Sequence, residues 1–136
     1  MNDNLYALFE SRFPADRSKP FLLLDDGREI SYGTAEKACA RYAAFLAGLG
    51  LAPGERVAVQ VEKSPEALLL YLACLRAGLV YLPLNSAYQQ GEVAYFLDNA
   101  EPAAVVAQPR SAPWLAPLAA ARGIRHVFSL DEDGKG

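Results

Sequence analysis

Few residue patterns in the 136-residue sequence have the spacing that a catalytic or phosphate-binding site requires. Neither Gly-x-Gly-x-x-Gly nor Gly-x-x-x-x-Gly-Lys-Ser/Thr occurs. Lys135 lies between two glycines, but no segment follows it here that would form a helix and bind a phosphate at its N-terminus. His126 is the only histidine, and no Ser or Cys stands at a nucleophile elbow. We interpret His126 as a surface or strand-edge residue rather than a catalytic base.

The acidic and sulfur-bearing residues also have structural interpretations. Asp25 and Asp26 resemble a carboxylate pair, but they precede a glycine in a pattern typical of a turn. The acidic residues 131–133 would attract a cation, and we interpret them as a solvated tail. Cys39 and Cys74 fall in expected helices without a Cys-x-x-Cys pair, which indicates two buried thiols in a reducing cytoplasm. We assign no catalytic, cofactor-binding or metal-binding residue from these patterns.

The overall composition restricts the class of protein. A chain of 136 residues fits one domain, and 52% hydrophobic with 21% charged residues is typical of a globular protein. The net charge of -3, with both signs mixed along the chain, argues against a nucleic-acid-binding surface. No apolar run is long enough to span a membrane, and the first residues have no signal-peptide pattern. We therefore expect a cytoplasmic protein that binds neither nucleic acid nor membrane.

The first part of the sequence predicts a helix, a hairpin and a second helix. Apolar residues recur on one face of residues 4–13, and Pro14 ends that helix. Strand candidates over residues 21–24 and 29–32 flank an Asp-Gly pair, which favours a tight hairpin turn. Ser31 is placed to cap a long amphipathic helix over residues 34–49, whose apolar positions follow three- and four-residue steps.

The rest of the sequence predicts an α/β fold with a parallel sheet. Four apolar strand candidates are centred at nearly equal spacings on Val59, Leu82, Val105 and Val127, and one helix separates each pair. This βαβαβαβ pattern is typical of a parallel sheet with right-handed crossovers and flanking helices. The hairpin either extends this sheet or packs elsewhere. The three intervening helices are expected over residues 67–75, 89–99 and 113–121, with Ser64 and Ser111 as caps of the first and the last.

The stretch of residues 75–97 connects two of these helices through a short strand. Gly78 stands where a helix needs a left-handed residue at its end. Pro83 has no N–H to donate to a strand ladder, so the sheet is expected to give way there. Backbone groups beside the carboxyl end of such a strand often line a ligand cleft. The simpler interpretation is a buried strand with an irregular exit.

The helix over residues 67–75 is apolar almost all round. Such a helix is normally covered on most of its sides. We expect that a chain this short cannot cover it, so that an exposed apolar surface remains. Self-association through that surface is the predicted consequence.

Three segments resemble the adenylate-forming superfamily of acyl-CoA synthetases, peptide-synthetase adenylation domains and luciferases. The clearest is similar to its second core motif: Arg76-Ala77-Gly78-Leu79-Val80-Tyr81-Leu82-Pro83-Leu84-Asn85. The segment Ile30-Ser31-Tyr32-Gly33-Thr34-Ala35 resembles the first core motif of the superfamily. Thr34 stands there in place of the usual Glu, which weakens the capping box. A third match is the turn over residues 51–58. The pair Leu84-Asn85, followed by Ala87-Tyr88 and Glu92, looks most like malonyl-CoA synthetases.

The resemblance implies an activity for a longer parent enzyme. Members convert a small-molecule carboxylate with ATP to an acyl-adenylate, and usually transfer the acyl group to CoA; the parent would use ATP, Mg and CoA. The family's phosphate loop, ribose-binding acid, hinge and C-terminal lysine lie downstream of the region matched here. Residues 1–136 would then be the N-terminal part of the large domain: 1–55 the helix, hairpin and amphipathic helix, 56–130 the α/β repeat, and 131–136 a tail. We expect this chain alone to be inactive and to bind no cofactor.

Two other interpretations stay open. The chain would be a free-standing, non-catalytic interaction module if its reading frame stops after Gly136. It would be the start of a peptide-synthetase adenylation domain if the resemblance to that branch is the relevant one, although that branch tends to have Asp where Asn85 stands. The coding sequence beyond codon 136 discriminates the fragment from the module.

Overall fold

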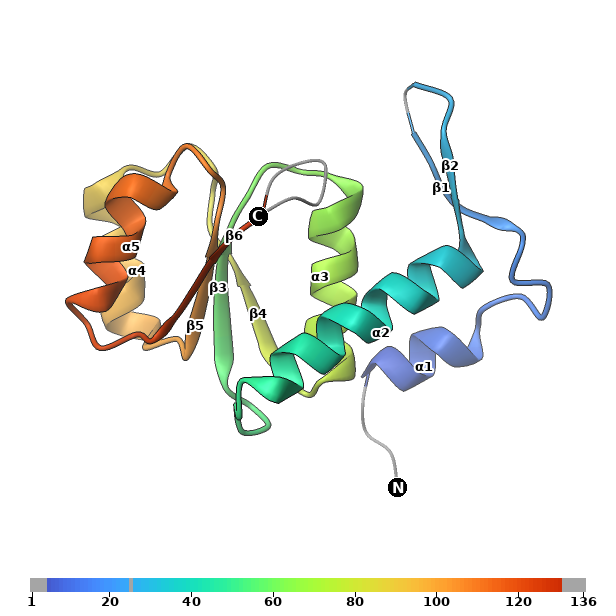
Figure 1. Ribbon diagram of the computed structural model, residues 1–136, viewed down its shortest axis with the longest axis horizontal. Coiled ribbons are helices and arrows are strands. Elements are labelled where there is room, and N and C mark those ends of the chain that lie inside the picture. Colours follow the sequence, from blue (N-terminus) through green and yellow to red (C-terminus); the bar gives the residue numbers. More distant parts are fainter. Residues whose placement is uncertain (1–4, 25, 131–136) are drawn as a thin grey trace.

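A computed structural model describes residues 5–24 and 26–130, and Figure 1 shows two separate sheets. The larger sheet is parallel, with strand order β4-β3-β5-β6. Its strands are β3 (Arg56–Gln60), β4 (Val80–Pro83), β5 (Ala104–Ala107) and β6 (His126–Ser129). The smaller sheet is the predicted hairpin, in which β1 (Pro20–Leu23) pairs antiparallel with β2 (Glu29–Ser31). The predicted α/β class is confirmed, and the hairpin does not extend the main sheet.

The described part of the chain contains five helices. Helices α4 and α5 cover one face, while α3 lies against the other and α2 crosses over α3 (Figure 1). None of the helices in the described part of the chain has the length and apolar character that a membrane span requires. The helices are α1 (Leu5–Ser11), α2 (Tyr32–Gly48), α3 (Pro65–Arg76), α4 (Gln90–Ala100) and α5 (Ala112–Ala120).

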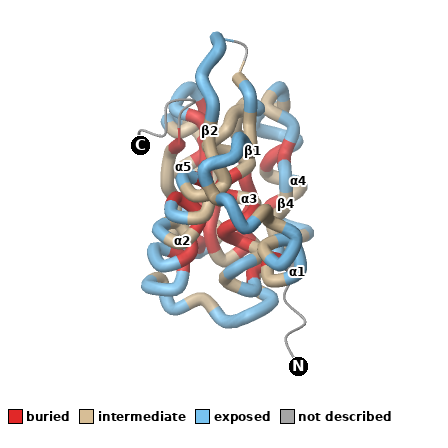
Figure 2. The backbone as a smooth tube through the Cα atoms, turned by 90° about the vertical axis from the view of Figure 1, so that its right-hand side faces the viewer, coloured by how far each residue is buried: buried red, intermediate tan, exposed pale blue. Residues whose placement is uncertain are grey.

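Successive residues of the central strands pack on opposite faces, so that the sheet separates two hydrophobic clusters. Val57 and Val59 belong to the cluster beneath α2 and α3, whereas Ala58 and Val105 belong to the cluster beneath α4 and α5. Figure 2 shows the buried segments gathered in the middle of the molecule, with the hairpin projecting from it. The strands that carry the core are therefore also the rigid base for the loops at their ends.

Two of the three predicted helix caps form. The Ser31 hydroxyl accepts a hydrogen bond from the Thr34 N–H at 3.1 Å, and the Ser64 hydroxyl accepts one from the Ala67 N–H at 3.1 Å. The prediction for Ser111 is wrong, because its own backbone is already helical (φ -95°, ψ -21°) and its side chain makes no cap bond. The Ser111 hydroxyl instead accepts a hydrogen bond from the Gln108 side chain at 3.0 Å.

The expectation that helix α3 lacks cover is also wrong. Leu69, Leu70 and Leu72 are buried, and no apolar side chain of residues 67–75 is exposed. Helices α1 and α2 pack against α3, and the Tyr42 hydroxyl joins α2 to α3 by donating a hydrogen bond to Glu66 Oε2 at 2.5 Å. The large apolar side chains that remain exposed lie on other elements: Leu8, Phe9, Leu23, Phe45, Val80 and Tyr95.

The stretch between α3 and α4 has the predicted turn and strand. Gly78 adopts φ +77°, the left-handed conformation expected after a helix. Strand β4 ends at Pro83 and is an edge strand of the described sheet. Because no described strand pairs with its outer side, the N–H that proline lacks interrupts no hydrogen bond between strands. The Leu84 N–H still donates to the Val59 carbonyl at 2.8 Å. From residue 85 onward the chain leaves the sheet and runs to α4.

Candidate functional site

The carboxyl ends of β3 and β5 form the point where the sheet changes its winding direction. The connection that leaves β3 enters α3 on one face, while the connection that leaves the adjacent β5 enters α5 on the other face. Open α/β sheets bind ligands in the crevice at such a switch point. The candidate site therefore consists of the loops of residues 61–64, 84–89 and 108–111.

Two buried glutamines lie at this edge of the sheet. Gln60 is the last residue of β3, and Gln108 directly follows β5; their exposed fractions are 0% and 4%. Gln60 Nε2 donates hydrogen bonds to the carbonyl oxygens of Asn85 at 3.1 Å and Tyr88 at 3.0 Å. Gln108 Nε2 donates to the Ser86 carbonyl at 3.0 Å and to the Ser111 hydroxyl at 3.0 Å. Both side chains thus contact the loop between β4 and α4.

The orientation of each glutamine amide follows from its partners. Backbone carbonyls only accept hydrogen bonds, so an NH₂ group must face them. This orientation leaves the Oε1 atoms of Gln60 and Gln108 buried, and neither has a hydrogen-bond partner in the described part of the chain. The hydrogen bonds that these two side chains make therefore all run through their NH₂ groups.

One ion pair lies at the mouth of the site. Arg110 Nη2 contacts Glu62 Oε1 at 2.7 Å and the Ser86 carbonyl at 3.3 Å. The two side chains are 64% and 40% exposed, so water screens the pair and its stabilising contribution is at most about 1 kcal/mol. Its role at this edge is to connect the loops that follow β3 and β5 to the loop that follows β4.

The loop between β4 and α4 has little regular structure of its own. The Asn85 side chain accepts a hydrogen bond from the Ala87 N–H at 2.9 Å, and the Asn85 carbonyl accepts one from the Tyr88 N–H at 3.0 Å. The Tyr88 ring stacks on Phe96 of α4, with the ring centres 5.4 Å apart. The loop ends beside a shallow hollow that Tyr88, Gly91, Glu92, Tyr95 and Phe96 line.

The residues considered for chemistry from the sequence lie away from this edge. His126 begins β6 at the opposite end of the sheet, where its ring stacks on Phe128. Cys39 and Cys74 are buried, as predicted, and burial raises the pKa of both thiols, to about 12 for Cys74. Asp26 serves the hairpin turn, where it accepts the Arg28 N–H at 3.0 Å. Asp25 and residues 131–136 lie outside the described residues.

No metal site is assigned to the described part of the chain. It contains no group of three or more His, Cys, Asp or Glu side chains that could hold a metal ion. Mg²⁺ prefers carboxylate and other oxygen ligands in a compact octahedral set. The residues at the switch point do not offer such a set, so we derive no step through a metal here.

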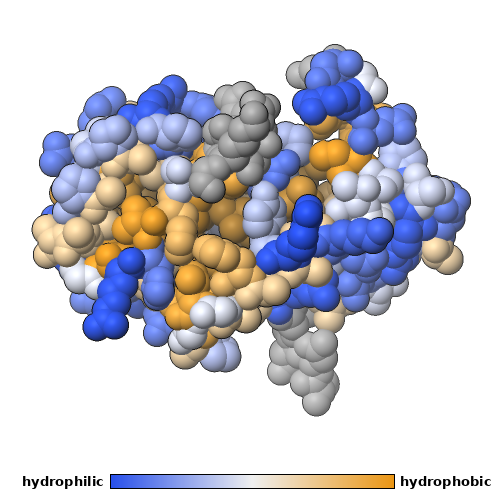
Figure 3. All heavy atoms as spheres, viewed as in Figure 1, coloured by the Kyte–Doolittle hydropathy of each residue, from blue (hydrophilic) through white to orange (hydrophobic). Residues whose placement is uncertain are grey.

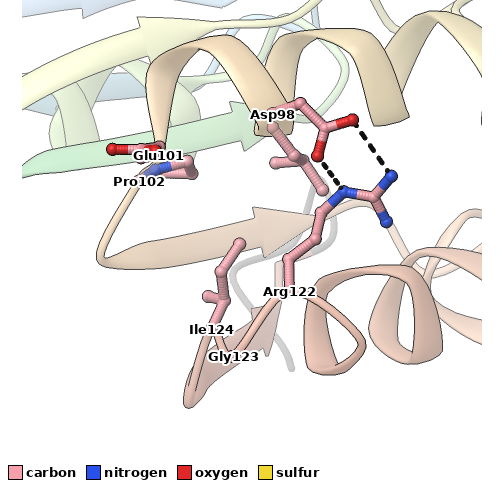
Figure 4. A pocket seen from close by; sticks show the side chains of 7 residues that line it. Asp98, Glu101, Pro102, Arg122, Gly123 and Ile124 are labelled. Atoms are coloured by element: carbon pink, nitrogen blue, oxygen red, sulfur yellow. Dashed lines mark hydrogen bonds and ion pairs between the residues drawn. The ribbon is translucent and has the colours of Figure 1, made fainter.

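A separate cavity of about 340 Å³ lies at the other end of the sheet, between the last turns of α4 and α5 (Figure 4). The Asp98 carboxylate and the Arg122 guanidinium face each other there, with Nε–Oδ1 at 2.7 Å and Nη2–Oδ2 at 3.3 Å. The hydrogen bond from Arg122 lowers the pKa of Asp98. Each charge thus already has its partner, and we interpret the pair as a link between α4 and the turn that follows α5 rather than a binding site.

An apolar groove runs between α2 and the edge strand β6. Figure 3 shows hydrophobic atoms gathered in the middle of this face, between α5 and α2. The Phe45 and Phe128 rings meet edge to face with their centres 5.0 Å apart, and Phe45 is 51% exposed. The apolar residues that line the groove are Tyr42, Phe45, Leu46, Leu70, Val106, Phe128 and Leu130.

Sequence reasoning missed both glutamines. The signal that could have found them is a glutamine at the end of each of two apolar strands, after Val59 in β3 and after Ala107 in β5. Glutamine is mostly exposed in folded proteins. Two of them that close neighbouring buried strands therefore indicate a polar cluster at one edge of the sheet.

Comparison with known proteins places the chain among AMP-binding enzymes. The family profile described as AMP-binding enzyme matches residues 9–135. Among solved structures, apo MatB from Rhodopseudomonas palustris is similar over the whole chain, with 44% sequence identity and a TM-score of 0.92. The chain spans 27% of that MatB chain. The ATP-bound form of MatB from the same organism matches at 43% identity and the same TM-score.

Curated relatives include large peptide synthetases. A linear gramicidin synthase protein from Brevibacillus parabrevis is 30% identical over 129 residues, which are 95% of this chain and 2% of that protein. The AMB antimetabolite synthetase AmbB of Pseudomonas aeruginosa is 35% identical over 107 residues, or 79% of this chain and 8% of that protein. The chain thus spans a small part of the length of each of these relatives.

Proposed function

The chain belongs to the AMP-binding enzyme family, and from that premise we propose that it is the N-terminal part of an ATP-dependent acid–CoA ligase that acts on malonate. The proposed reaction has two steps. The carboxylate attacks the α-phosphate of ATP to form an acyl-adenylate and releases pyrophosphate. The thiol of CoA then displaces AMP and forms the thioester.

The observation that carries the proposal is the match to MatB over the whole chain, at 44% identity and a TM-score of 0.92. The motif over residues 76–85 and the residues after it support the malonate-specific branch, because they resemble malonyl-CoA synthetases. Residues 1–136 are proposed to form part of the large domain, with 1–55 and 56–130 as its two sections. The buried, protonated thiols of Cys39 and Cys74 fit the proposed cytoplasmic location.

Within this proposal, the described residues supply a framework and one wall of the site. ATP and CoA are substrates of the proposed reaction, and neither a glycine-rich phosphate loop nor an Mg²⁺ ligand set is assigned to this part. The loop of residues 84–89 is placed at the switch point, where a ligand would bind. We therefore propose that the 136-residue chain alone does not catalyse adenylation.

A second candidate function is the start of a peptide-synthetase adenylation domain. The similarity to the linear gramicidin synthase protein and to AmbB favours it. Such a domain would activate an amino acid with ATP and then transfer it to a carrier-protein thiol instead of CoA. The two candidates share the first step, so the acid and the acceptor thiol discriminate them.

The complete reading frame that contains this chain is expected to release pyrophosphate from ATP with malonate and to form malonyl-CoA when CoA is added. The 136-residue chain, purified in parallel, is expected to release no pyrophosphate above background. Pyrophosphate release measures adenylation, and chromatographic detection of malonyl-CoA measures the second step. Acetate and a panel of amino acids are the control acids.

Each other outcome points to a different function. Activation of an amino acid without thioester formation on CoA would favour the peptide-synthetase candidate. A reading frame that stops at codon 136 would favour the free-standing interaction module. Pyrophosphate release by the 136-residue chain would contradict the proposal that this chain alone does not catalyse adenylation.

The isolated chain is expected to self-associate at high concentration, through the groove between α2 and β6 rather than through an exposed face of α3. Burial of the exposed apolar area around Phe45 is the driving force. The Phe45→Lys variant is expected to have a lower weight-average mass in light scattering, whereas Tyr95→Lys, at an exposed position outside the groove, is the matched control. A monomeric wild-type chain at high concentration would contradict this prediction.

A further inference from the structure

We propose that Gln60 and Gln108 are positioning residues that together hold the loop of residues 85–88 in one conformation, as a fixed wall of the substrate crevice at the carboxyl end of the sheet. The presence of a substrate there rests on the proposed function. The holding of the loop rests on the hydrogen bonds of the structure alone, so the two parts of the inference can be tested separately.

The two glutamines supply three of the four hydrogen bonds that described side chains outside this loop donate to its carbonyls, and Arg110 supplies the other. Three of their four donated hydrogen bonds end on loop carbonyls, those of Asn85, Ser86 and Tyr88. The fourth joins Gln108 to Ser111 at the start of α5, and so fixes the Gln108 side chain itself. The carbonyls at both ends of the loop are held by Gln60 from β3, and the one between them by Gln108 from the β5 side.

The path of the loop explains why it needs such support. It starts at the edge strand β4, passes the carboxyl end of β3 and enters α4, which lies on the face of the sheet opposite α3. Asn85 and Ala87 are exposed, so the outer side of the loop is open to a ligand while its carbonyls point to the glutamines. A polar loop without ladder hydrogen bonds keeps one conformation only when tertiary contacts impose it.

The hydrogen bonds of these two side chains are all made by their donor groups. Both oxygens are buried without a donor in the described part of the chain. The NH₂ groups, in contrast, all have acceptors within 3.1 Å.

Methionine is a suitable replacement because it has a similar length and removes the donor and the unpartnered acceptor together. Gln60→Met and Gln108→Met are therefore expected to loosen the loop more than they weaken the whole fold. Amide hydrogen exchange of the 136-residue chain measures both effects. The N–H groups of Ala87 and Tyr88, which are hydrogen-bonded to Asn85, are expected to exchange at least tenfold faster in either variant.

Gln90→Met is the matched control, since Gln90 is exposed at the start of α4. It is expected to leave the exchange of Ala87 and Tyr88 unchanged. Unchanged exchange at these two amides in Gln60→Met and Gln108→Met would overturn the proposal. An equal acceleration of the core amides of β3 and β5 would also overturn it, because the glutamines would then act on general stability only.

A second experiment measures KM and kcat of the complete protein with its substrates. A mobile loop lowers the fraction of molecules that are ready to bind, and the apparent dissociation constant rises in inverse proportion to that fraction. Gln60→Met is thus expected to raise KM for at least one of malonate, ATP and CoA by about tenfold, with a smaller change in kcat. Unchanged KM values beside faster exchange would overturn the role of the loop as a crevice wall. If the complete protein is not a ligase, the exchange experiment still decides whether the glutamines hold the loop.

Discussion

Replacing Leu115 by alanine is expected to lower the free energy of unfolding by about 2–5 kcal/mol. Leu115 is completely buried in the cluster beneath α4 and α5, where it packs with residues such as Val93 and Leu97. The substitution removes apolar contacts and leaves a cavity that the close-packed surroundings fill only in part. Urea unfolding followed by circular dichroism measures the loss.

Leu23→Ala is the matched control for this prediction. Leu23 is 73% exposed in the hairpin, so its truncation is expected to change stability by about 0.5 kcal/mol or less. Similar losses for the two variants would contradict the packing described here. A loss of cooperativity in Leu115→Ala, with an unchanged Leu23→Ala, would locate the defect in the layer formed by α4 and α5.

Raising the pH above 9 is expected to destabilise the fold progressively. Burial raises the pKa of the Cys74 thiol from 9.0 to about 12 and that of the Tyr81 hydroxyl from 10.0 to about 12. Burial also raises the pKa of Tyr42, with a further contribution from its hydrogen bond to Glu66. The folded chain therefore keeps these protons over a pH range in which the unfolded chain releases them.

The sign of the effect follows from this difference. The stabilising contribution of Cys74 is complete below pH 9.0 and is lost as the pH rises toward about 12. Within that window, each group that ionises only in the unfolded chain lowers the free energy of unfolding by about 1.4 kcal/mol per pH unit. Urea midpoints at pH 8, 9, 10 and 11 are expected to fall with increasing steepness.

Two substitutions test which groups cause the alkaline loss. Cys74→Ala is expected to reduce the fall between pH 9 and 10, and Tyr81→Phe the fall above pH 10, because each removes one titrating group. Tyr95→Phe is the control, since Tyr95 is 65% exposed. Stability that stays constant or rises between pH 9 and 11 would contradict the burial of these groups.

Local features of the fold were predictable because they depend on residues close together in the sequence. The cap at Ser31 needs only a hydroxyl three residues before an N–H, and it forms as predicted. The left-handed turn at Gly78 and the end of β4 at Pro83 follow from the backbone of those residues themselves. The alternation of helices and apolar strands was enough to predict a parallel sheet, which the structure confirms.

The errors concern contacts between distant segments. The sequence of α3 shows that it needs cover on several sides, but not that α1 and α2 provide it. The side chain of Ser111 was expected to cap α5, whereas it binds Gln108, because that helix begins with Ser111 already in a helical conformation. Neither result follows from the spacing of residues within one element.

The sequence by itself thus determined the class of fold, the order of its elements, most of their caps and the resemblance to a family. Only the tertiary structure decided the strand order β4-β3-β5-β6, and with it the switch point where Gln60 and Gln108 meet the loop of residues 85–88. The physical reason is the range of the interactions. Periodicity and capping act within a few residues, while strand order and the pairing of buried polar groups depend on side chains that folding alone brings together.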